Sequence, residues 1–137
     1  QQETSMSTLT YISMDNNTHE LVFNEATRKA TDEFIALWAK WQTMQSGNLY
    51  IVLDMRPAGM VPLRYLTKQM KKILAKHAEG ENVYIAIVLD DPQMLMVTQV
   101  LLRTIVKRQP VQYFTQVEKA HLWIKIEQKK AQARNAR

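Results

Sequence analysis

The sequence predicts an α/β fold: a single mixed, mostly parallel sheet with an N-terminal antiparallel hairpin and four helices. Three apolar runs, residues 49–53, 83–89 and 111–114, have the composition of buried strands. A segment with helical periodicity follows each of them. Strands that are apolar on both faces and alternate with helices are typical of parallel sheets covered by helices.

Two segments of alternating polarity, 8–14 and 19–24, flank the sequence Asp-Asn-Asn-Thr at 15–18. Asparagine and aspartate tolerate the left-handed backbone conformations that tight turns between strands require. We therefore predict an antiparallel hairpin. A disordered arm is expected before it at 1–7, and a single domain is expected over 8–128.

The helices are predicted from apolar spacing and from their end signals. The first covers 25–45, and proline suits the first turn of the second helix, which begins at Pro62. Asp91 is placed to cap the third helix, and a fourth helix follows the last strand and continues into a basic tail at 129–137. The apolar stripe of the first helix comprises Ala30, Phe34, Leu37, Trp38, Trp41 and Met44.

Composition narrows the function classes. The 18 Lys and Arg exceed the 13 Asp and Glu, which gives a net charge of +5. This excess lies mainly in the tail, without the interleaved aromatic residues that stack on bases, so we expect no nucleic-acid partner. The absence of cysteine excludes disulfides and thiolate chemistry and fits a cytoplasmic location. Asp90, Asp91 and Pro92 interrupt the longest apolar region, so no membrane span is expected.

From Thr8 to about Ile126 the succession resembles the STAS domain (the anti-sigma-factor antagonist fold), and most closely its uncharacterised bacterial STAS-like relatives. The resemblance rests on the opening hairpin, the strand ending Val52-Leu53-Asp54, the spacing of Leu63 and Leu66, and the segment 114–124, Phe-Thr-Gln-Val-Glu-Lys-Ala-His-Leu-Trp-Ile. It implies strands in near-sequential order and a regulatory, non-catalytic, protein-binding role.

The chain departs from that family at its phosphorylation site. Regulatory STAS domains carry an Asp-Ser-Ser-Gly-like motif at the start of the helix after the second strand, and a kinase partner phosphorylates its serine. No serine or threonine lies between Asp54 and Leu66. The resemblance therefore implies a module without the usual phosphorylation switch.

Candidate site residues gather where the parallel strands end. Right-handed crossovers bring Asp54, Asp90 and Thr115 to one rim, where open α/β sheets bind ligands. Carboxylates there can hold magnesium or share a proton. The simpler alternative is that Asp91 caps a helix and the other carboxylates bond to loop amides, and we expect no catalytic residue, cofactor or metal.

The loop that follows Asp54 is the most irregular in the chain. Arg56 and Arg64 bracket it and favour an anionic partner beside a helix N-terminus. Gly59 and Met60 lie between them, and flexible methionines suit adaptable apolar contacts. The alternative is an ordinary surface loop.

Three functions follow from these residues. The first is a non-catalytic protein-interaction module that binds another protein, or a second copy in a homodimer, through this loop and the next helix. The second is a small carrier or sensor that binds an apolar or anionic, lipid-like small molecule at the rim. An enzyme that uses Asp54 and Asp90 ranks last.

Overall fold

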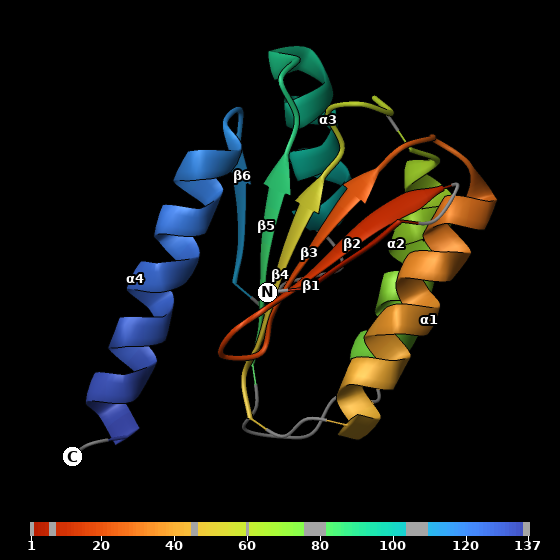
Figure 1. The fold of residues 1–137 in the computed structure, drawn as a ribbon. Coiled ribbons are helices and arrows are strands. Elements are labelled where there is room, and N and C mark those ends of the chain that lie inside the picture. The colour runs from red at the N-terminus through yellow and green to blue at the C-terminus, as the bar shows by residue number, and fades with distance from the viewer. Residues whose placement is uncertain are drawn as a thin grey trace.

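The computed structural model describes residues 2–5, 8–44, 47–59, 61–75, 82–103 and 110–135. These residues form six strands and four helices (Figure 1). In chain order the elements are β1 (Gln2–Ser5), β2 (Leu9–Met14), β3 (Thr18–Phe23), α1 (Arg28–Met44), β4 (Leu49–Asp54), α2 (Leu63–Leu74), β5 (Val83–Val88), α3 (Pro92–Arg103), β6 (Val111–Phe114) and α4 (Val117–Asn135).

The strands form one sheet in the order β1-β2-β3-β4-β5-β6. β1 and β3 each pair antiparallel with β2, whereas β3 to β6 run parallel to one another. In the parallel part Ile51 lies opposite Ile85. The predicted class, a mixed and mostly parallel sheet with an N-terminal hairpin and four helices, is confirmed.

The central strands β4 and β5 are buried along their whole length, on both faces. Helices α1, α2 and α3 lie on one face, and α4 lies on the other (Figure 1). Alternate residues of each strand therefore enter two different cores, as the pleat of a strand requires. The strand residues of the core under α1–α3 include Leu21, Ile51, Leu53, Ile85 and Ile87. Those of the core under α4 are Tyr50, Val52, Tyr84, Ala86 and Val88.

Helix α1 shows how the apolar stripe works. The Thr27 hydroxyl accepts a hydrogen bond from the Ala30 N–H at 3.2 Å, which caps the first turn. The stripe residues Ala30, Phe34, Trp38 and Trp41 are buried. The prediction that Met44 belongs to this buried stripe is wrong, because Met44 is 69% exposed. Met44 is the last residue of the helix, so its side chain reaches solvent at the helix end.

The disordered arm predicted at 1–7 is wrong for Gln2–Ser5, which forms β1. This strand pairs with β2 along the edge of the sheet, with Glu3 opposite Ile12. Its sequence is polar, so no hydrophobic alternation marks it. Main-chain hydrogen bonds to a neighbouring strand do not depend on side-chain polarity, and they define this strand.

The fourth helix, which the sequence predicts to continue into the basic segment 129–137, extends to Asn135. Ala131 lies two turns after Ile124 and keeps the same helix face on the sheet, with only 8% of Ala131 exposed. The Arg134 guanidinium donates a hydrogen bond to the Tyr84 hydroxyl at 3.4 Å. The cations of this segment therefore belong to a packed helix.

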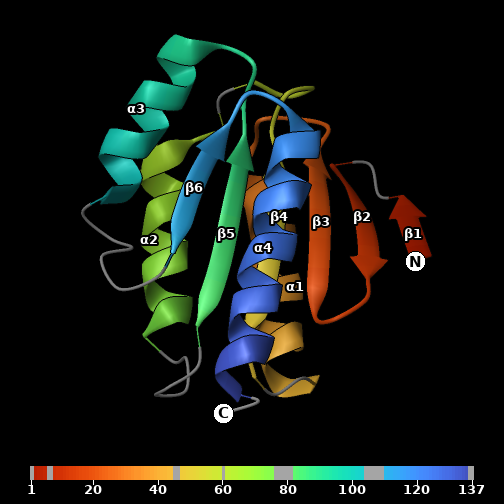
Figure 2. The same cartoon turned by 90° about the vertical axis from the view of Figure 1, so that its left-hand side faces the viewer.

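Helix α4 covers only part of its face of the sheet. It packs on β4, β5 and β6, and Figure 2 shows β1 and β2 lying beyond its edge. On this uncovered part Ile12, Met14 and Val22 are half-buried. The hairpin thus has one face in the main core and one face beside α4.

We expect Phe34→Ala to lower the free energy of unfolding by about 3–5 kcal/mol, because it leaves a cavity in the main core. Met44→Ala on the same helix should change it by less than about 0.5 kcal/mol, since Met44 is exposed. Urea denaturation followed by circular dichroism measures both. Equal losses in the two variants would contradict the assigned core.

Candidate functional site

Asp54 ends β4 at the carboxyl rim of the sheet and is buried, with 6% of its side chain exposed. Arg56 grips it with two hydrogen bonds, from Nε to Oδ1 at 2.9 Å and from Nη2 to Oδ2 at 2.7 Å. The Arg56 backbone N–H also donates to Oδ1 at 3.1 Å. The hydrogen bonding of the Arg56 guanidinium to the Asp54 carboxylate is the main cause of the raised pKa of Arg56. The two side chains form one fixed unit at the start of the loop.

The two other rim carboxylates have different surroundings. Asp91 Oδ1 accepts hydrogen bonds from the N–H groups of Gln93 at 2.9 Å and Met94 at 3.5 Å. The prediction that Asp91 caps the third helix is therefore confirmed. Asp90 precedes it and is exposed. The bond to a loop amide that was predicted for the other carboxylates is present at Asp54, whose Oδ1 accepts from the Arg56 N–H.

The loop residues singled out in the sequence divide between the rim and helix α2. Gly59 adopts a φ of +78°, which favours glycine, and its N–H donates to the Met55 carbonyl at 2.8 Å. Arg64 is exposed on α2. Met60 lies outside the described residues. Pro62 occupies the N-cap position of α2, one residue before the position predicted.

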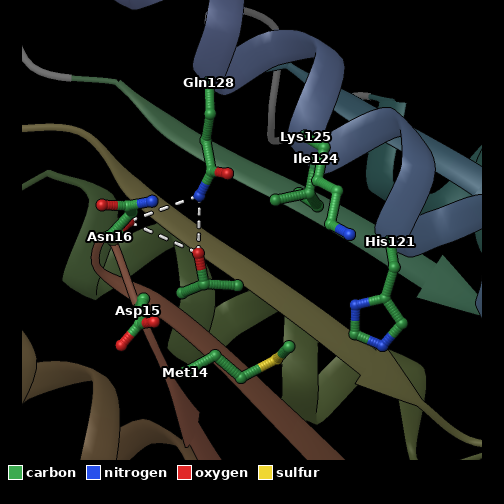
Figure 3. A pocket seen from close by; sticks show the side chains of 8 residues that line it. Met14, Asp15, Asn16, His121, Ile124, Lys125 and Gln128 are labelled. Carbon is green, nitrogen blue, oxygen red and sulfur yellow. Dashed lines mark hydrogen bonds between the residues drawn. The ribbon is translucent and has the colours of Figure 1, made fainter. Parts of the chain in front are cut away.

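A second polar cluster lies at the opposite end, where α4 meets the hairpin, and sequence reasoning missed it. His121 Nε2 on α4 donates to Glu20 Oε1 on β3 at 2.6 Å. Gln128, two turns later, donates from Nε2 to the Thr18 hydroxyl at 2.6 Å and to the Asn16 carbonyl at 3.4 Å (Figure 3). We use the name α4–hairpin seam for the group formed by Asn16, Thr18, Glu20, His121 and Gln128. The only local signal is the spacing of His121, Lys125 and Gln128, which share one side of the helix.

The turn of the hairpin is shaped by two asparagines. Asn16 and Asn17 have φ values of 61° and 55°, in the left-handed region that asparagine tolerates better than most residues. This conformation brings the Asn16 carbonyl within reach of Gln128. The predicted role of the Asp-Asn-Asn segment in a tight turn is confirmed.

The amino end of the sheet also holds buried aromatic residues. His19 is only 2% exposed. It stacks on Trp41 at 4.0 Å between ring centroids, and its Nδ1 lies 2.6 Å from the Tyr11 hydroxyl. On the other face Tyr50 stacks on Tyr84 at 4.9 Å, and burial is the main cause of the raised pKa of Tyr50.

Three cavities open at this amino end of the parallel strands, opposite the end at which Asp54 lies. One of about 270 Å³ lies between the hairpin turn and α4 (Figure 3). A second cavity, of about 280 Å³, shares Asn16 and Gln128 with the first and is lined largely by amide side chains. The third, of about 240 Å³, lies beside Trp41 and His19. These three cavities lie at the opposite end of the sheet from Asp54, Asp90 and Asp91, the carboxylates that the sequence predicts at a site.

Within the described ranges, no group of three or more histidine, aspartate or glutamate side chains is arranged to hold a metal ion. No helix in the same ranges is both long and apolar enough to cross a membrane. The Asp54 oxygens that were considered for magnesium are bonded to Arg56.

Comparison with protein-family models, with curated proteins and with solved structures gave no match. The resemblance to STAS domains stays a prediction from the sequence.

The seam predicts an energetic coupling between residues 101 positions apart. His121→Ala and Glu20→Ala should each lower the free energy of unfolding by about 1–2 kcal/mol, because each leaves a largely buried partner without its hydrogen bond. The double variant should lose less than the sum, by about 0.5 kcal/mol or more. Urea denaturation of the four proteins measures this coupling, with Leu122→Ala as an exposed control on α4. Additive losses would show that the pair does not hold α4 in place.

Proposed function

We propose that this chain is a non-catalytic, STAS-like protein-interaction module of a regulatory kind, which acts in the cytoplasm and lacks the phosphorylatable serine of that family. The support from the sequence is the succession of elements and the absence of serine and threonine between Asp54 and Leu66. The support from the structure is a surface with the composition of a docking site, on the outer side of α2 and α3.

The single observation that carries the proposal is a group of exposed apolar side chains on α3. Met96 is 66% exposed, Val97 45% and Val100 57%. Val100 lies four residues after Met96 and three residues after Val97, so the three side chains lie on one side of the helix. Clustered apolar side chains in water are typical of surfaces that bind other macromolecules. Methionine and valine offer such a partner contact area without any reactive group.

Charge indicates what kind of partner fits this surface. Helix α2 packs beside α3 and exposes Arg64, Lys68, Lys71 and Lys72. Neither helix contains an aspartate or a glutamate. A second copy of the chain would bring like charges together across this surface, which is unfavourable. We therefore infer a different protein with acidic and apolar side chains on its contact surface.

The rim residues belong to the edge of this surface in the proposal. Arg56 is fixed on Asp54, so it offers a rigid cationic edge with 34% of its side chain exposed. The exposed Asp90 carboxylate lies near Arg56, so a basic group of the partner would be favoured next to Asp90. The alternative function, a carrier of a small apolar or anionic molecule at this rim, has less support, because the cavities described above lie at the other end.

Val100→Asp tests the proposal, because it places a carboxylate in the centre of the apolar group. We expect it to weaken capture of the partner from an extract of the source cells at least about tenfold, and to weaken binding of that partner after purification equally. Leu122→Asp, at a site 59% exposed on α4, is the matched control and should bind normally.

Three outcomes would contradict the proposal. The first is equal loss of binding in both variants, and the second is a partner whose contact surface is basic. The third is binding of the wild type to vesicles of anionic lipid that Val100→Asp abolishes, which would assign the surface to a membrane.

A further inference from the structure

The cavity of about 270 Å³ at the α4–hairpin seam has walls of two kinds (Figure 3). One wall consists of Met14, Asp15, Asn16 and Thr18, at the turn between β2 and β3. His121, Ile124, Lys125 and Gln128 form the other, on α4. Two segments more than a hundred residues apart thus enclose a space suited to a small molecule.

Three of the six polar side chains that line this cavity, those of Thr18, His121 and Gln128, form hydrogen bonds with other residues. His121 is bonded to Glu20, and the Gln128 amide nitrogen is bonded to Thr18 and to the Asn16 carbonyl. These bonds fix the shape of the two walls. They leave little hydrogen-bonding capacity for a ligand from these groups.

Two charged side chains of the lining have no hydrogen-bond or ion-pair partner in the described part of the chain. Asp15 and Lys125 both line the cavity. Neither side chain forms an ion pair or a hydrogen bond with any other residue of the described part of the chain. Figure 3 shows Lys125 extending from α4 and Asp15 standing at the turn on the opposite side. The cavity therefore presents one cation and one anion across its width.

Part of the lining of this cavity is apolar. Met14 lies half-buried at its base on the hairpin side, and Ile124 of α4 is only 2% exposed. A ligand whose charged groups lie between Asp15 and Lys125 would place its aliphatic side chain over Met14 and Ile124. Burial of aliphatic groups on such a floor is favourable, and the two charges fix orientation.

We propose that this cavity binds a small zwitterion of the aliphatic α-amino acid class. The ligand's carboxylate contacts Lys125, its ammonium group contacts Asp15, and its aliphatic side chain packs on Met14 and Ile124. A ligand with a negative charge alone would face the unpaired Asp15 carboxylate, and a ligand with a positive charge alone would face Lys125. Only a molecule with both charges is complementary to the two walls. This site is separate from the surface of α2 and α3.

The test is titration of the full chain, followed by ¹⁵N-¹H NMR, with leucine, valine and methionine. Leucine is compared with 4-methylpentanoate, which lacks the ammonium group, and with 3-methylbutylamine, which lacks the carboxylate. We expect at least one amino acid to shift the amides of residues 14–18 and 121–128. Both single-charge analogues of a bound leucine, and both variants Lys125→Gln and Asp15→Asn, should weaken binding about tenfold or more. Lys129→Gln, an exposed change on the same helix, should not.

The proposal is overturned if none of the three amino acids shifts these amides. It is also overturned if an analogue with one charge binds as tightly as leucine, or if Lys129→Gln weakens binding as much as Lys125→Gln. Because the amide spectrum reports folding in the same experiment, a variant that unfolds is recognised. In that case Lys125→Arg, which keeps the charge, must retain binding for the proposal to stand.

Discussion

Burial of β4 and β5 on both faces is the constraint on which the rest of this structure depends. All residues of Leu49–Asp54 and Val83–Val88 are buried, so neither face of these strands can be left to solvent. Helices must therefore cover the sheet twice. Parallel neighbours need crossover connections, and the helices of these connections, α1, α2 and α3, cover one face. Helix α4, which follows the last strand, covers the other face.

The two covers are unequal, and the functional features follow from this inequality. Three helices seal one face with a large apolar core, whereas α4 covers the other face alone. At the border between α4 and the hairpin, apolar packing gives way to the hydrogen bonds of the seam. A border of this kind leaves open space, and the cavities beside Gln128 occupy it. On the three-helix side, α2 exposes cations and α3 exposes apolar side chains on the outer surface.

The features that the sequence predicts well are those encoded locally. The apolar runs mark β4 and β5, helical spacing marks the buried stripe of α1, and Asp91 before Pro92 marks the start of α3. Strand β1 escaped prediction because an edge strand held by main-chain bonds needs no apolar pattern. The packing of the last turns of α4 on the sheet escaped prediction because a run of cations resembles a solvated tail, although Ala131 keeps the buried spacing.

The candidate sites divide in the same way. Asp54 was found because it directly follows a buried run, but its bidentate pairing with Arg56 depends on the loop conformation. Glu20 and His121 are separated by 101 positions, so no local spacing joins them. Asp15 and Lys125 meet at one cavity only because the hairpin lies beside the docked α4.

The most direct test of this account is the measurement of interstrand nuclear Overhauser effects in the isotopically labelled chain. The account predicts contacts of parallel β4 and β5, with Ile51 beside Ile85, together with contacts from Ile124 of α4 to the opposite face of the same strands. Antiparallel contacts between these strands, or helix contacts on one face only, would contradict it.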